Sequence, residues 1–173
     1  MVLSGKRAII LVENQYQVLE VWYPYYRLKE EGAEVRLVGS GSAQSYSSKV
    51  GYPAAVDLSA DDVDINEIDV VVIPGGYAPD MMRRYPAMVK LVQDAYHQGK
   101  VVAAICHGGW MLASADILRG KRATCFFAIK DDVVHAGAEY IDAEVVRDGR
   151  LITSRKPDDL PGFCREIIDT LKA

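Results

Sequence analysis

The chain has 173 residues, of which 50% are hydrophobic and 25% are charged, and its formal net charge at pH 7 is −4. This length suits one domain with a full core, so we expect a single domain over residues 1–173. No apolar run approaches the length of a membrane span, and the first residues do not resemble a secretion signal, so we expect a cytoplasmic protein that does not enter a membrane. The scattered basic residues give no electrostatic footprint for nucleic acid, which favours a small-molecule or peptide partner.

The first part of the chain predicts two strands around one helix. Residues 7–12 form a short apolar run and residues 34–39 alternate like a strand, while residues 18–31 carry apolar side chains at helical spacing. Pro24 fits a helix only near its first turn or at a kink. We therefore expect the segment around Glu20 to be a turn that leads into the helix.

The rest of the chain continues to alternate strands and helices. In chain order we expect a polar loop over 40–49, strands over 69–73 and 101–105, helices around 88–95 and over 110–115, a strand over 123–127, a helix over 129–136, extended chain over 140–146, a hairpin turn at 148–149 and a helix opened by Pro157. Apolar strands that alternate with amphipathic helices indicate an α/β fold with a mostly parallel sheet covered on both faces.

Cys106 is the most informative position, because it follows the apolar strand over 101–105 and precedes His107, two glycines and a helical stretch. A sharp turn from strand to helix lifts its central side chain above the sheet edge, and the first helical turn offers N–H groups and a positive dipole end that favour thiolate over thiol. We therefore expect Cys106 to be a reactive nucleophile. The alternative stays open that this cysteine only fills space at the end of a core strand.

Three polar segments follow strands of the predicted sheet. They are residues 13–20, the Pro-Gly-Gly of residues 74–76, and the pair Cys106-His107. Ligands of parallel α/β sheets bind beyond the carboxyl ends of the strands, so these segments are expected to meet at one edge.

A thiolate that attacks a carbonyl group needs N–H donors for the developing oxyanion. The N–H of His107, directly after the nucleophile, is the expected first donor, and that of Gly76 is the expected second. If Glu20 lies near the thiol, burial would raise its pKa and let it donate a hydrogen bond or move a proton. The side chain of His107 is left open, because neighbouring residues at such a turn point in divergent directions.

The three cysteines, Cys106, Cys125 and Cys164, are odd in number and widely separated, without metal-ligand spacing to any histidine. We expect no disulfide framework, no metal site and no cofactor.

Several motifs occur together along nearly the whole chain. The specific pair is AICHG over 104–108 with PGG over 74–76 upstream. Further matching segments are residues 23–25, 27–32, 78–79, 129–132, 142–146 and 154–155. In this combination the chain resembles the ThiJ/PfpI family, of the class I glutamine amidotransferase-like superfamily. The resemblance implies a flavodoxin-like three-layer sandwich, with Cys106 as the nucleophile, an oxyanion site near Gly76 and His107, and the Glu20 carboxyl beside the thiol.

The resemblance also implies homo-oligomers, either dimers or hexamers. In the protease-like branch of the family, a neighbouring subunit supplies an acidic residue to the histidine after the nucleophile, and the matching position is Asp80. Relatives often carry Tyr or His followed by Pro where this chain has Phe126-Phe127, which removes a polar group from the expected pocket. Asp80 is also one methylene shorter than the usual glutamate, and Gly109 stands where relatives often have proline.

We expect a cofactor-independent cysteine enzyme that acts on carbonyl compounds. The leading hypothesis is a hydrolase of the deglycase or glyoxalase type, acting on methylglyoxal- or glyoxal-derived adducts in stress protection. Two alternatives stay open: a PfpI-type intracellular cysteine peptidase, and a non-catalytic stress protein that senses redox conditions by oxidation of Cys106. The physiological substrate and the size of the oligomer are also left open.

Overall fold

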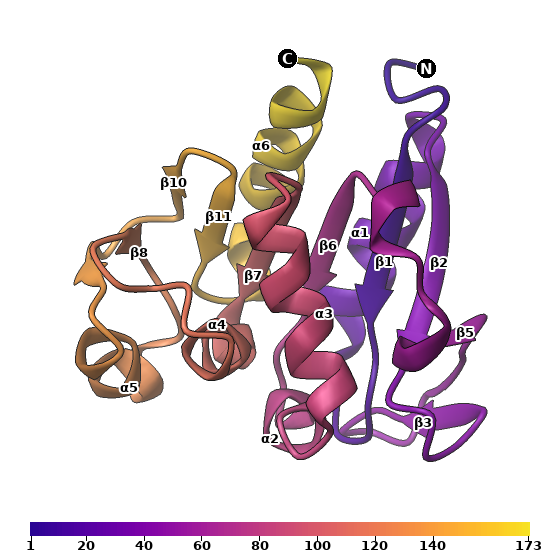
Figure 1. Cartoon of the computed structure of the whole chain (residues 1–173), viewed down its shortest axis with the longest axis horizontal. Helices are drawn as coiled ribbons and strands as arrows, with labels where there is room; N and C mark the ends of the chain where they lie inside the picture. Colours follow the sequence, from indigo (N-terminus) through magenta and orange to yellow (C-terminus); the bar gives the residue numbers. More distant parts are fainter.

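The computed structural model describes all 173 residues and places a seven-stranded sheet between helices (Figure 1). In spatial order the strands are β10 (Val145–Asp148), β11 (Leu151–Ser154), β7 (Val101–Ile105), β6 (Val70–Ile73), β1 (Arg7–Leu11), β2 (Glu34–Gly39) and β5 (Leu58–Ser59). Neighbouring strands are parallel except β10 and β11, which form an antiparallel hairpin across Gly149. The mostly parallel α/β sheet predicted from the sequence is confirmed, and so is the hairpin.

Helices cover both faces of the sheet. Helices α1 (Val18–Glu30) and α6 (Leu160–Lys172) contact each other on one face, and α3 (Pro86–His97) packs on β6 and β7 from the other (Figure 1). Because β6 and β7 are enclosed from both sides, they carry apolar side chains on both faces and are buried throughout. The three layers expected from the sequence are therefore present.

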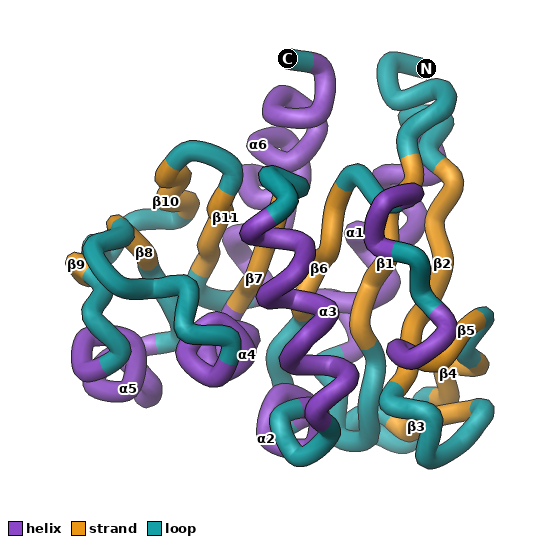
Figure 2. Tube along the Cα trace, in the orientation of Figure 1, coloured by secondary structure: helices purple, strands orange, loops and turns teal.

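The remaining elements are short, and Figure 2 shows most of them beyond the two ends of the sheet and along its lower edge. They are the strands β3 (Ser45–Ser47), β4 (Pro53–Ala55), β8 (Arg122–Ala123) and β9 (Glu139–Tyr140), the helices α2 (Ala78–Met82), α4 (Gly109–Ser114) and α5 (Lys130–His135), and 3₁₀ turns at Ala60–Asp62, Ile65–Glu67, Cys106–Gly108, Phe127–Ile129 and Pro157–Asp159. No helix combines the length and the apolar character needed to cross a membrane.

The expected turn around Glu20 is wrong, because α1 is already helical there. The side chain of Gln17 accepts the N–H groups of Leu19 and Glu20 and so caps the helix one residue before Val18. Pro24 lies inside α1, where its missing N–H leaves the Glu20 carbonyl without the usual helical donor. The cap therefore fixes Glu20 in the first helical turn.

The strand expected over 123–127 is also wrong. Only Arg122 and Ala123 pair, as β8, and the chain then bends toward the turn at Cys106, whose carbonyl accepts the N–H of Phe126 at 3.3 Å. A 3₁₀ turn follows this bend. Near the N-terminus, the loop expected over 40–49 contains β3, which forms an antiparallel hairpin with β4.

Candidate active site

The loops that follow β1 and β6 meet at the carboxyl edge of the sheet, which is the lower edge in Figure 1. The N–H of Gln17 donates to the carbonyl of Gly75 at 3.3 Å, and the N–H of Tyr77 donates to the carbonyl of Gln15 at 2.9 Å. Cys106 follows β7 at the same edge, next to Gly75. The three polar segments of the sequence thus lie together, as expected.

Cys106 forms a sharp turn between β7 and the short helix α4. Its φ is +60°, in the left-handed region that side chains other than glycine rarely adopt, whereas Ile105 directly before it is extended. Gly108 lets this turn lie against β6, because a Cβ at that position would be 2.6 Å from the carbonyl oxygen of Ile73. The predicted strand-to-helix elbow at Cys106 is present.

Glu20 enters the site from the first turn of α1 and is completely buried. One carboxyl oxygen, Oε2, accepts the N–H of Gly75 at 2.6 Å, while Oε1 has no hydrogen-bond partner. Burial raises the pKa of Glu20 to about 7, although the Gly75 N–H, the Cys106 thiol and the charge of Lys49 act in the opposite direction. Glu20 can therefore hold or release a proton near neutral pH, which is the behaviour that the sequence allowed for a buried carboxyl beside the thiol.

Gly75 is the residue that lets the carboxyl and the thiol come together. A Cβ on Gly75 would lie 2.7 Å from both the Cβ of Cys106 and Oε2 of Glu20. From the sequence a role was expected for Gly76 but not for Gly75. The signal was available in the doubled glycine of the PGG motif, but the close neighbours of each glycine depend on the fold.

The protonation of Cys106 differs from the sequence-based expectation. Burial, followed by the charge of Glu20, raises the pKa of the thiol to about 12, while the backbone N–H groups of His107 and Gly76 lower it. The expected thiolate is therefore wrong for the resting site, because burial and a neighbouring carboxylate outweigh the two donors. Those two N–H groups nevertheless point at the sulfur from the positions predicted for an oxyanion site.

The imidazole of His107 faces the thiol, which answers a question that the sequence left open. Its Nδ1 lies 3.3 Å from Sγ of Cys106. The ring stacks on Phe126 with 5.1 Å between centroids and meets Tyr77 and Trp110 edge-on at 5.6 and 5.0 Å. Burial, followed by the charge of Lys49, lowers the pKa of His107 and so favours the neutral imidazole.

Two residues singled out in the sequence lie apart from this cluster. Asp80 on α2 pairs with Arg84 at 2.5 Å and forms no hydrogen bond or ion pair with His107 of its own chain. Phe127 is 75% exposed, so of the two adjacent phenylalanines only Phe126 contacts His107. No group of three or more His, Cys, Asp or Glu side chains is arranged to hold a metal ion.

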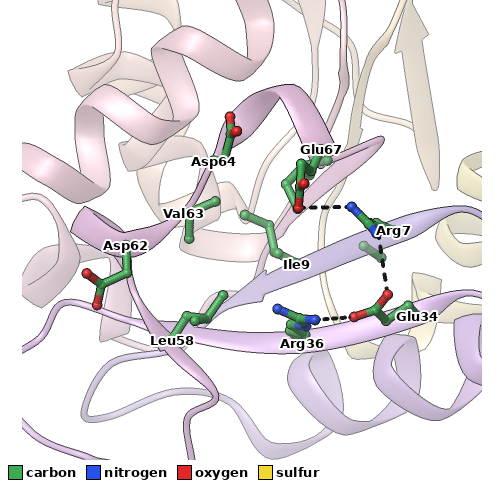
Figure 3. A pocket seen from close by; sticks show the side chains of 11 residues that line it. Arg7, Ile9, Glu34, Arg36, Leu58, Asp62, Val63, Asp64 and Glu67 are labelled. Carbon is green, nitrogen blue, oxygen red and sulfur yellow. Dashed lines mark ion pairs between the residues drawn. The ribbon is translucent and has the colours of Figure 1, made fainter.

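A separate cavity of about 140 Å³ lies against β1 and β2, beneath the chain over 58–68 (Figure 3). At its rim Arg7 pairs with Glu67 at 2.9 Å and with Glu34 at 3.5 Å, and Arg36 pairs with Glu34 at 2.5 Å. None of the site residues predicted from the sequence lines this cavity.

Fold and site together define an α/β protein with a thiol and a carboxyl group side by side at a strand-to-helix elbow. Residues 6–170 match the DJ-1/PfpI family, and the chain therefore belongs to this family. The ThiJ/PfpI resemblance noted in the sequence is confirmed.

Two curated relatives match almost end to end. A deglycase from Pyrococcus abyssi is 45% identical over 166 residues, which cover 96% of this chain and 99% of the relative. A Bacillus subtilis protein, provisionally named a cysteine protease, is 35% identical over 168 residues, which cover 97% of this chain and 99% of the relative.

Among solved structures, a two-domain protein from Anabaena variabilis with DJ-1/ThiJ/PfpI-like and ferritin-like domains superposes with a TM-score of 0.94 at 46% identity. The match covers 96% of this chain and 48% of that protein, so this chain spans about half the length of that relative.

Proposed function

We propose that this protein is a cofactor-independent cysteine hydrolase of the deglycase or glyoxalase type, acting on carbonyl compounds and on adducts derived from methylglyoxal or glyoxal. The observation that carries the proposal is the placement of the Cys106 thiol between the Glu20 carboxyl and the N–H groups of His107 and Gly76. This arrangement offers a nucleophile, a proton carrier and two donors for a developing oxyanion.

The first chemical step transfers the thiol proton to Glu20 while Sγ bonds to the aldehyde carbon of the substrate. The carbonyl electron pair moves to oxygen, where the two N–H groups stabilise the charge. With methylglyoxal, a proton then passes from the attacked carbon to the neighbouring ketone carbon. The oxyanion re-forms a C=O bond and the ketone oxygen takes the proton held by Glu20, which leaves a thioester of lactate on Cys106. Water cleaves this thioester, so methylglyoxal and one water give lactate and the free thiol.

Glu20 suits the proton transfers in this sequence. Its pKa of about 7 lets it accept and return a proton near neutral pH, and its Oε1 is not engaged by other groups of the chain. The names of the relatives, several of which are called deglycases, support the same assignment.

The test is turnover of methylglyoxal and of its adducts with thiols, followed as lactate and thiol release, for the wild type, Cys106→Ala, Glu20→Gln and Cys125→Ala. Cys125 is the matched control, since it is another free cysteine with 1% exposure. We expect loss of turnover by at least about a thousandfold in Cys106→Ala, about a hundredfold in Glu20→Gln, and no loss in Cys125→Ala. Unchanged turnover in Cys106→Ala would refute the proposal.

A cysteine peptidase is the second candidate, and the 3.3 Å approach of His107 Nδ1 to the thiol is the observation that favours it. In this alternative a homo-oligomer places Asp80 of a neighbouring subunit beside His107 and orients the ring. Cleavage of an unstructured protein, lost in both Cys106→Ala and Asp80→Asn, would support the peptidase. Adduct turnover that is insensitive to Asp80→Asn, without cleavage of the protein, would favour the deglycase.

A further inference from the structure

Lys49 places a cation at the rim of the site. This residue was not among those expected there from the sequence. Its Nζ lies 5.3 Å from the centre of the Tyr77 ring, and Tyr77 in turn meets the imidazole of His107 edge-on. The charge of Lys49 also acts on Glu20 and His107. The ammonium group therefore lies within electrostatic reach of both polar side chains that flank the thiol.

The backbone that carries Lys49 is firmly held. Its N–H donates to the carbonyl of Tyr16 at 3.0 Å, which joins the β3–β4 turn to the loop after β1. The hydroxyl of buried Ser48 accepts the N–H groups of Val50 and Tyr52 at 3.2 and 2.9 Å, and the hydroxyl of Tyr16 donates to the carbonyl of Tyr52 at 2.7 Å. The backbone of Lys49 therefore needs little further ordering when a ligand meets this cation.

Lys49 has no carboxylate partner in the chain. It takes part in none of the sixteen ion pairs, from Lys6–Asp69 to Lys172–Asp169. The charge of Lys49 acts to lower the pKa of Glu20, but this carboxyl is completely buried and already accepts a hydrogen bond from Gly75. The Tyr77 ring beneath the ammonium is 52% exposed, so the cation and the aromatic face are both open to a ligand.

We infer that Lys49 and Tyr77 form an anion subsite, and that the preferred substrates of the Cys106 site carry a carboxylate within a few bonds of the reacting carbonyl or carbinol carbon. Such substrates are oxo acids and the carbonyl adducts of free or N-acylated amino acids. Adducts on internal protein side chains lack this carboxylate. The inference rests on the proposed function for its chemistry, but the charge preference can be measured without turnover.

The first experiment compares alkylation of Cys106 by iodoacetate and by iodoacetamide, two reagents that attack the same thiol and differ by one negative charge. Rates are normalised to those of a small free thiol and measured for the wild type, Lys49→Gln and Lys29→Gln. Lys29 is the matched control, because its ammonium also covers a tyrosine ring, that of Tyr25 at 4.8 Å, but near the far end of α1. Only Lys49→Gln is expected to reduce the iodoacetate preference.

In Lys49→Gln we expect the ratio of the iodoacetate rate to the iodoacetamide rate to fall by about threefold to tenfold at low ionic strength. The fall should be smaller in about 1 M salt, because salt screens a charge pair. An equal preference in all three proteins would overturn the anion subsite. If neither reagent modifies Cys106, the site admits no small electrophile, and both the subsite and the proposed function fail.

The second experiment uses the hemithioacetals that methylglyoxal forms with N-acetylcysteine and with N-acetylcysteine amide. We expect the wild type and Lys29→Gln to turn over the carboxylate adduct with about threefold to tenfold higher kcat/KM, mainly through KM, and Lys49→Gln to lose this preference. Equal kcat/KM values in the wild type would overturn the subsite alone. No turnover of either adduct would contradict the proposed function, while the alkylation ratios would still decide the subsite.

Discussion

Two groups of ionisable side chains lie next to the same sheet and differ in burial and in pairing. In the cavity of Figure 3, Arg7 pairs with Glu34 and Glu67 on exposed side chains. At the carboxyl edge, Glu20 is completely buried, its Oε1 is unpartnered, and its neighbour is a thiol with a strongly raised pKa. Exposed pairs contribute little to folding, whereas a buried unmatched carboxyl costs stability. This difference supports the proposal that the carboxyl edge is the functional region.

The largest expected effect concerns the free energy of unfolding and its dependence on pH. Between pH 4.5 and about 7 the folded chain keeps a proton on Glu20 that the unfolded chain has released, so stability falls as pH rises through this window. A pKa difference of this size corresponds to about 3 kcal/mol. We expect Glu20→Gln to lack this loss, and to be more stable than the wild type at about pH 8 by a similar amount.

Urea denaturation at a series of pH values measures this effect. Glu30→Gln is the matched control, because Glu30 lies on the same helix but is exposed and paired with Arg27 at 3.3 Å. If the stability curves of the wild type and Glu20→Gln run parallel across the window, Glu20 does not carry the buried charge assigned to it.

The rate of Cys106 alkylation by iodoacetamide tests the coupling of the thiol to Glu20. Between pH values of about 7 and about 12 the pair shares one proton, so a constant fraction of thiolate is present. The rate should rise about tenfold per pH unit below this range and level off within it. In Glu20→Gln the bend near pH 7 should vanish. The same bend in both proteins would assign it to another group.

Two glycine variants, Gly75→Ala and Gly149→Ala, distinguish a steric clash of the new Cβ from a cost of backbone conformation. In Gly75→Ala the new Cβ lies 2.7 Å from Cys106 Cβ and Glu20 Oε2, so we expect a loss of about 1–3 kcal/mol and slower alkylation of Cys106. Gly149→Ala is the control, since Gly149 has a φ of +63° and open space around the new Cβ. It should cost about 1 kcal/mol and leave Cys106 reactivity unchanged. Equal alkylation rates in both variants would mean that Gly75 does not shape the site.

The smallest effect is expected in the cavity of Figure 3. Glu67→Gln removes the 2.9 Å ion pair with Arg7, yet both side chains are substantially exposed and Arg7 retains Glu34. We expect a change in unfolding free energy within about 0.5 kcal/mol, diminished further by salt, and no change in turnover. A loss above about 2 kcal/mol would remove the contrast between the two regions.

The sequence predicted the sheet, the elbow at Cys106 and the shared edge of the loops, because these follow from strand order and turn residues. It was wrong about the start of α1, since a glutamine cap with Pro24 in the helix interior runs against local preferences. It was also wrong about the resting thiol. The N–H donors that lower the pKa of the Cys106 thiol can be predicted from neighbouring residues. The burial that raises this pKa more strongly comes from segments far apart in the chain.

The positions of Lys49 and Gly75 at the site also could not be predicted from the sequence. Neither belongs to a pattern that distinguishes it from other surface lysines or turn glycines, and each acquires its place only when the β3–β4 hairpin and the loop after β6 fold over the same edge. Asp80 is the opposite case, because its proposed role depends on a neighbouring subunit, and within one chain its partner is Arg84.

The positive φ of Cys106 bears on whether a cysteine can persist at this position. A φ of +60° is less strained for glycine than for cysteine, and strain of this kind amounts to about 1–3 kcal/mol. Selection for folding stability alone would therefore favour replacement of the cysteine at this position. On the proposed function, selection for the chemistry of Cys106 maintains the sulfur, so a descendant that no longer needs this chemistry would be expected to lose the thiol and retain its fold.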